Sequence, residues 1–81
     1  MWLDIYVYES HQAFFNVKSI CCFYIYGADQ IQIEQENGIT TIFYFKNNDA
    51  AQRFYQALKN AIVWKDSFND PAIGTIVVSE E

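Results

Sequence analysis

The sequence is poor in residues that interrupt regular structure and in positive charge. It has one proline and three glycines, and its 10 acidic against 5 basic residues give a net charge of −5. No cluster of Lys or Arg occurs, so binding to a nucleic-acid backbone or to an anionic membrane is not expected, because both need concentrated positive charge. With 52% hydrophobic residues, we expect one ordered domain over residues 1–81.

Long apolar runs are absent as well. The longest, residues 20–26, has the length of a strand and is too short to cross a bilayer. The first four residues contain an acid and lack the basic region of a signal peptide. Neither a membrane span nor a leader segment is therefore expected.

Cysteine is limited to the adjacent pair Cys21 and Cys22. Neighbouring residues of a strand point to opposite faces of a sheet, and a bridge between them would strain the geometry that a disulfide prefers. We predict two free thiols, and with them a reducing compartment and a cytoplasmic location.

The residues that catalysis or metal binding would need are few and scattered. His11 is the only histidine and lies in a polar segment between Ser10 and Gln12. A zinc site needs three or four converging ligands, which one histidine and two neighbouring cysteines do not supply. The acidic segment from Asp66 to Asp70 lacks the central glycine and terminal glutamate of a calcium loop. We expect no enzyme activity, metal or cofactor.

The pattern of apolar residues predicts five strands and one helix. Residues 9–16 and 66–71 read as connections, the first with one helical turn capped by Ser10. The strands are expected at residues 2–8, 17–26, 30–36, 39–46 and 73–78, with 17–26 central in the sheet. The fold class is thus α+β: a small antiparallel sheet in the order β-β-β-β-α-β, with one amphipathic helix packed on one face.

The helix is predicted over residues 50–64. It follows a capping asparagine, Asn47 or Asn48, and Asp49 suits the positive end of the helix dipole. Its apolar stripe consists of Ala50, Phe54, Ala57, Leu58, Ala61 and Ile62.

Asn37-Gly38 predicts a two-residue type I′ hairpin turn, since both central residues of that turn need positive φ. The register would place Glu36 opposite Ile39, Ile33 opposite Ile42, and Ile31 opposite Tyr44. One face then carries the isoleucines and Tyr44. The other carries a mixed set, Gln30, Gln32, Glu34, Thr41, Phe43 and Phe45.

Aromatic residues make up 19% of the chain, more than one helix on one sheet face can bury. Either the sheet curls, or a partner covers the second face, or the aromatic side chains line a small-molecule pocket. We favour a non-enzymatic protein-interaction module, a homodimer or an adaptor, that binds itself or another protein. The expected interface residues are Phe43, Phe45, Tyr6, Tyr8 and Trp2.

The alternative hypothesis starts from the acidic charge. Small acidic proteins of mobile elements resemble this chain in size and charge, and such proteins block a basic nucleic-acid-binding groove of a partner. The acidic surface would consist of Glu34, Glu36, Asp66, Asp70, Glu80 and Glu81. Acids alternating on an edge strand, as Glu34 and Glu36 would, are also typical of a solvated face that discourages aggregation.

Overall fold

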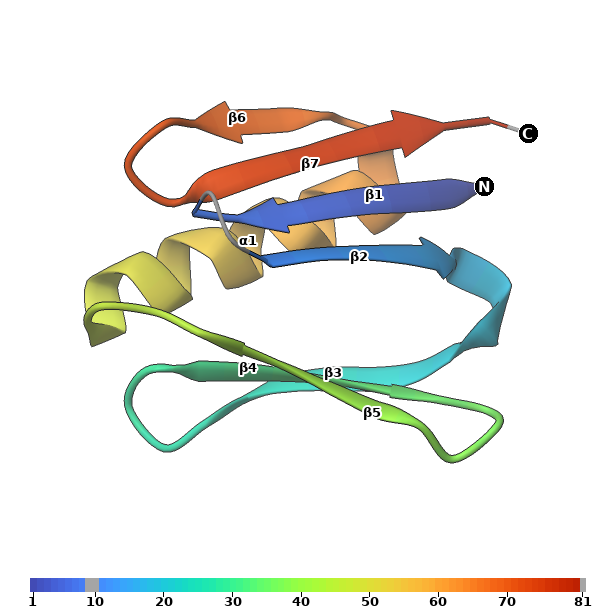
Figure 1. Cartoon of the computed structure of the whole chain (residues 1–81). Coiled ribbons are helices and arrows are strands. Elements are labelled where there is room, and N and C mark those ends of the chain that lie inside the picture. The colour runs from blue at the N-terminus through green and yellow to red at the C-terminus, as the bar shows by residue number, and fades with distance from the viewer. Residues whose placement is uncertain (9–10, 81) are drawn as a thin grey trace.

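The strands form two antiparallel sheets, with one helix beside them (Figure 1). The computed structural model describes residues 1–8 and 11–80, and the side chains of His11 and Gln12 lie outside that description. One sheet has the strand order β2-β1-β7-β6 and the other β3-β4-β5. The predicted α+β class is confirmed, but there are two sheets rather than one.

The elements largely follow the predicted segments, with two additions. The additional strands, β2 and β6, lie in segments expected to be connections, and each pairs with a neighbour in the sheet. Ser10, the predicted cap of a helical turn, lies outside the described residues. The elements are β1 (Trp2–Val7), β2 (His11–Asn16), the 3-10 helix η1 (Val17–Ser19), β3 (Ile20–Tyr26), β4 (Gln30–Gln35), β5 (Thr40–Tyr44), α1 (Asn48–Trp64), β6 (Phe68–Asp70) and β7 (Gly74–Ser79).

The helix ends at Trp64, as predicted, and begins at Asn48, two residues earlier than predicted. The side chain of Asn47 accepts a hydrogen bond from the Ala50 amide at 2.9 Å, and Asp49 lies in the first turn. Lys65, which follows the last helical residue, caps the C-terminal end with a left-handed backbone. Among the described residues, no helix is long and apolar enough to cross a membrane. The buried side chains of α1 are Ala50, Ala51, Phe54, Ala57, Leu58 and Ala61.

The core lies where the inner faces of the two sheets meet α1, which runs along the gap between them in Figure 1. Phe15 of β2 meets Phe43 of β5 edge-on, with ring centroids 6.5 Å apart. The ring centroid of Phe54 in α1 lies 5.3 Å from that of Phe45 and 5.9 Å from that of Phe68. Both inner sheet faces are therefore covered within one chain, which accounts for part of the aromatic content.

The β4–β5 turn is longer by one residue than predicted. The Gly38 amide donates to the Gln35 carbonyl and the Gln35 amide donates to the Ile39 carbonyl, both at 3.0 Å. Gly38 has φ 85°, whereas Asn37 is not left-handed. These features define a three-residue loop, a type I turn followed by a glycine bulge. The type I′ prediction is wrong.

The longer loop moves the register by one residue. Ile33 pairs with Thr41, and Ile31 pairs with Phe43 rather than Tyr44. Because side chains alternate along a strand, a shift of one residue exchanges its two faces. Phe43 and Phe45 therefore point into the core, at 0% and 5% exposure.

The central strand of the three-stranded sheet is β4, and β3 is an edge strand. The prediction that residues 17–26 form a central strand is wrong, because residues 17–19 form η1 and the chain enters β3 from the other sheet. Glu34 consequently lies on a central strand and not on an edge.

Candidate interaction surfaces

The face of the four-stranded sheet that points away from α1 carries large side chains. In β1 the residues alternate, so that Leu3, Ile5 and Val7 are buried while the residues between them face outward. Asp4 pairs with Phe14 of β2 on one side and with Val77 of β7 on the other. We call this surface the Trp2 face; it consists of Trp2, Asp4, Tyr6, Phe14, Thr75 and Val77.

An aromatic stack dominates the Trp2 face. The rings of Trp2 and Phe14 are parallel within 10°, with centroids 4.8 Å apart, and Phe14 is 60% exposed. Beside the stack, the Tyr6 hydroxyl donates to Asp4 Oδ2 at 3.0 Å. This hydrogen bond is the main reason why the pKa of Tyr6 is raised, followed by desolvation and the Asp4 charge. The stack is a flat apolar surface that solvent reaches.

The outer face of the three-stranded sheet mixes tyrosines with amides. Cross-strand pairing sets Gln30 between Tyr26 and Tyr44, which are 58% and 62% exposed. The Tyr24 hydroxyl lies 2.7 Å from Glu34 Oε2 and 3.0 Å from Gln32 Oε1. Its pKa is raised, chiefly by the hydrogen bond to Glu34. We call this surface the Tyr24 face; it consists of Tyr24, Tyr26, Gln30, Gln32, Glu34, Ile42 and Tyr44.

The two cysteines are free, as predicted, and both are exposed. A bulge in β3 shifts the register between Ile20 and Cys22, and both cysteines are among the residues that line an open groove of 320 Å³ between β3 and α1, together with Lys59. Desolvation, and then the negative charge of Glu34, raise the pKa of the Cys22 thiol. A raised pKa disfavours the thiolate, so Cys22 is not an activated nucleophile.

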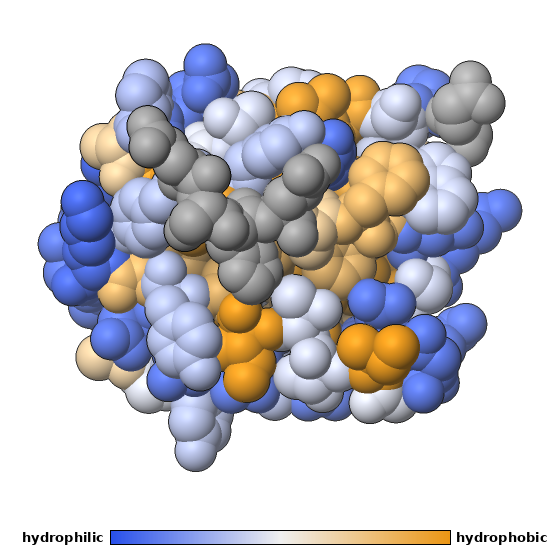
Figure 2. Space-filling model, in the orientation of Figure 1, coloured by the Kyte–Doolittle hydropathy of each residue, from blue (hydrophilic) through white to orange (hydrophobic). Residues whose placement is uncertain are grey.

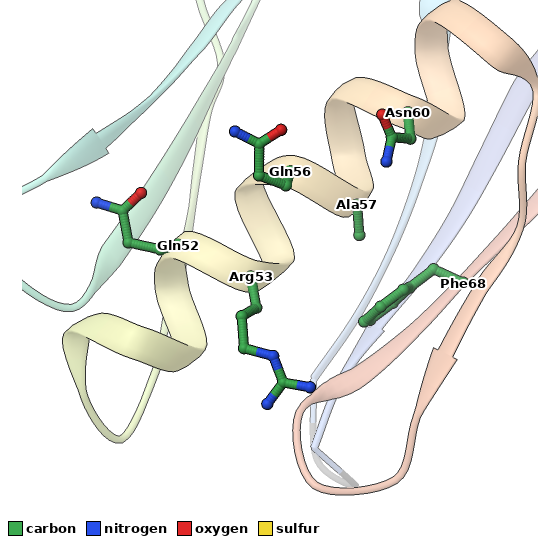
Figure 3. A pocket seen from close by; sticks show the side chains of 6 residues that line it. All are labelled: Gln52, Arg53, Gln56, Ala57, Asn60 and Phe68. Atoms are coloured by element: carbon green, nitrogen blue, oxygen red, sulfur yellow. The ribbon is translucent and has the colours of Figure 1, made fainter.

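A second open groove, of 380 Å³, separates α1 from β6 (Figure 3). The ring of Phe68 points toward α1, whereas the side chains of Gln52 and Gln56 point away from Phe68. Arg53 forms an ion pair with Asp70 at 3.0 Å. Amides and a paired guanidinium supply neither a nucleophile nor a general base. Nor do three His, Cys, Asp or Glu side chains of the described chain gather into a possible metal site.

The predicted interface residues do not share one surface. Trp2 and Tyr6 face outward on the four-stranded sheet, but Phe43 and Phe45 belong to the core. Tyr8 is half-buried, its ring centroid 6.1 Å from that of Phe45. The prediction of one interface that includes Phe43 and Phe45 is wrong, because the predicted two-residue turn assigned these two side chains to the wrong face of β5.

Sequence reasoning missed Phe14, which was treated as part of a connection. Phe14 and Phe15 are neighbours, so a strand must place them on opposite sides of the sheet. Phe15 is 2% exposed and Phe14 is 60% exposed. The alternation of β2 was the signal that could have identified Phe14 as a surface residue.

The predicted acidic residues that the structure describes are spread over several elements. Glu34 lies on the outer face of β4, and Glu36 is exposed in the β4–β5 turn. Asp70 forms an ion pair with Arg53. Glu80 follows β7, and its Oε2 lies 3.4 Å from Lys65 Nζ. Asp66 is exposed after α1, Glu81 lies outside the described residues, and His11 contributes its backbone to β2.

Apolar surface occurs as separate patches among polar side chains on the side of the molecule seen in Figure 2. Tyrosine and tryptophan rings are pale on a hydropathy scale, so exposed fractions rather than colours identify the two aromatic faces. No family model, curated protein or solved structure matches the chain.

Proposed function

We propose that this protein is a non-enzymatic protein-interaction module whose contact surface is the Trp2 face. The observation that carries this proposal is the parallel stack of Trp2 and Phe14, with Phe14 60% exposed. Exposed aromatic side chains that lie together are the usual energetic anchors of protein interfaces. Tyr6 and Val77, at 37% and 45% exposure, extend the same surface.

The Trp2 face is favoured over the Tyr24 face because its exposed rings are stacked and its polar groups are fewer. Each face has a polar side chain that already accepts a hydrogen bond from a tyrosine, Asp4 from Tyr6 and Gln32 from Tyr24. On the Trp2 face Asp4 lies between Phe14 and Val77, whereas the Tyr24 face has Gln30, Gln32 and Glu34 among its tyrosines, and each buried polar group costs free energy unless the partner supplies its hydrogen bonds. An ordered ring stack also loses little side-chain entropy on binding. A protein with its own apolar or aromatic patch is the partner that fits.

The test is a quantitative capture from native lysate with three versions of the protein. Phe14→Ala removes a ring that is 60% exposed on the Trp2 face, and Tyr44→Ala removes a ring that is 62% exposed on the Tyr24 face. We expect Phe14→Ala to lose the captured protein and Tyr44→Ala to retain it. The reverse pattern would contradict the proposal.

Salt separates this proposal from the acidic-inhibitor alternative. Apolar contacts weaken little as salt rises, whereas the Debye length falls from about 10 Å at 0.1 M to about 3 Å at 1 M. We expect the dissociation constant of the captured partner to change little over that range, and to be insensitive to Glu34→Gln combined with Glu36→Gln. Binding that collapses in salt and is lost in the double variant would replace the aromatic surface with the acidic one.

A further inference from the structure

We propose that the partner of the Trp2 face is a second copy of this chain, joined edge to edge by antiparallel pairing of β2 with β2 of the second copy. This inference rests on the proposed function, because Phe14 belongs both to the Trp2 face and to the β2 edge. It adds the partner, the symmetry and the register.

The four sheet edges differ in how well they are protected. β6 is three residues long, and β3 carries a bulge, both of which discourage pairing with another chain. Next to β5, the Lys46 amide donates to the Tyr8 hydroxyl at 2.9 Å, which blocks the end of that edge. β2 has six residues, pairs with β1 without a bulge, and contains no Pro, Lys, Asp or Glu. β5 also pairs without a bulge and contains none of these residues, but it is one residue shorter and Lys46 closes its end. β2 is therefore the longest open edge; it lies at the end of the four-stranded sheet (Figure 1).

The backbone groups at the β2 edge follow from one hydrogen bond. The Val17 amide donates to the Met1 carbonyl at 3.0 Å, in line with the β1–β2 register. Hydrogen-bonded residues alternate along an antiparallel strand, so Phe15 and Ala13 also direct their backbone groups toward β1. The amides and carbonyls of Gln12, Phe14 and Asn16 therefore point to the open edge.

These three residues are symmetric about Phe14, which suits a two-fold axis. Phe14 would pair with Phe14 of the second copy, and Gln12 with Asn16 of the second copy in both directions. Each of these pairs exchanges two backbone hydrogen bonds. The Asn16 carbonyl already accepts from Ser19 Oγ at 2.7 Å, but a carbonyl oxygen has two lone pairs. The outward groups of the edge are thereby satisfied by an identical strand.

Side chains and charge favour the same arrangement. Opposed Phe14 rings would lie between the two Trp2 rings, each already 4.8 Å from its own Phe14, so four aromatic side chains would form one row across the joined sheets. Each copy carries a net charge of −5, yet residues 10–28 contain no Asp or Glu. The paired strands would thus bring no carboxylate of their own to the junction, and Asp4, which pairs with Phe14, lies one strand behind the edge.

The experiment combines sedimentation velocity with amide hydrogen exchange on the full chain over a range of protein concentrations. The wild type should reach twice the monomer mass. As it does, exchange should slow at the amides of Phe14 and Asn16, and not at those of Ala13 and Phe15, which β1 already protects. Phe14→Pro removes the backbone donor that faces the open edge, together with the Phe14 ring, and should remain monomeric, with a native circular dichroism spectrum. Phe14→Ala, which removes the ring and keeps the donor, shows how much of the loss is due to the ring. Phe14→Lys, which adds an edge charge, is the second variant in case the proline variant does not fold.

Tyr44→Lys is the matched control, because Tyr44 is 62% exposed on the other sheet and lies outside the Trp2 face. It should leave the dimer intact. Val77→Lys tests face-to-face packing, because Val77 lies on the Trp2 face two strands away from the β2 edge. A dimer that Val77→Lys dissociates, and in which exchange at the Phe14 and Asn16 amides is not slowed, would mean face-to-face packing, which overturns the edge pairing and leaves the proposed function standing. A monomer at every concentration overturns the second copy as partner, while capture of another protein through Phe14 would still support the proposed function. If the protein neither dimerises nor captures a protein through Phe14, both the second copy as partner and the proposed function are overturned.

Discussion

The hydroxyl of Tyr8 accepts a hydrogen bond from the backbone amide of Lys46, 38 positions later in the chain, at 2.9 Å. Tyr8 directly follows β1 in one sheet, and Lys46 follows β5 in the other. Tyr8 has a left-handed backbone, φ 55°, which takes its side chain out of the alternation of β1 and brings its ring to Phe45. The Lys46 ammonium lies 5.2 Å from the centre of the same ring. One side chain thus joins the two sheets at this end of the molecule.

Removing that hydroxyl should weaken the connection between the sheets. We expect Tyr8→Phe to lower the free energy of unfolding by about 1 kcal/mol, because the ring remains and one hydrogen bond to a backbone amide is lost. Urea denaturation followed by circular dichroism measures the change. Tyr44→Phe, at an exposed position, should stay within about 0.5 kcal/mol of the wild type. Equal effects of the two variants would contradict the proposed role of Tyr8.

The buried face of α1 should dominate stability. Leu58 is 0% exposed, and Leu58→Ala should destabilise the protein by about 2–5 kcal/mol, through lost burial and the cavity left behind. Val63, on the same helix, is 64% exposed, so Val63→Ala should change the denaturation midpoint little. An unchanged midpoint for Leu58→Ala would show that this helix face is not packed as described.

Two glycines should respond differently to alanine. A Cβ at Gly74 would collide with the backbone carbonyl of Tyr6, which cannot move without disturbing the β1–β7 pairing. A Cβ at Gly38 meets nothing within 4 Å, and the cost there is the left-handed backbone alone. We expect Gly38→Ala to lose about 1 kcal/mol and Gly74→Ala to lose clearly more, in thermal unfolding. The opposite order would contradict the close approach of β7 to β1.

The sequence predicted the helix well because its signals are local. The Asn47 cap, the acidic first turn and the spacing of Phe54 and Leu58 all act within a few residues of one another. The strands were harder to place, because the partner of a strand is set by distant residues. β2 was overlooked because its pairing with β1 depends on a short connection rather than on a strong pattern of its own.

The surface was less predictable than the core for a specific reason. A single residue in the β4–β5 loop decides whether Phe43 faces the core or the solvent, and Asn37-Gly38 is compatible with both loop lengths. Trp2 and Tyr6, two of the expected interface residues, do face outward, because the alternation of β1 does not depend on any turn. Their neighbours Phe14 and Val77 could be added only when the strand order was known.

The contact between Tyr24 and Glu34 gives a prediction in pH. The Glu34 carboxylate holds the proton on the Tyr24 hydroxyl, so the pKa of Tyr24 in the folded protein lies above its ordinary value of 10.0. A raised pKa means that the contribution of this contact to stability is fully present below about pH 10, the unfolded pKa, and is lost as pH rises through the folded pKa. Glu34→Gln removes the negative charge and should lower the pKa of Tyr24.

Carbon-13 NMR of the tyrosine Cζ atoms measures this pKa directly during an alkaline titration. Tyr6, whose pKa is raised through Asp4 on the other sheet, serves as an internal reference that Glu34→Gln should leave unchanged. Glu36→Gln is the matched control. Glu36 is exposed in the β4–β5 turn, and its substitution removes the same negative charge. If both glutamine variants lowered the pKa of Tyr24 equally, general electrostatics would be the cause. The 2.7 Å contact between the Tyr24 hydroxyl and the Glu34 carboxylate requires that only Glu34→Gln does so.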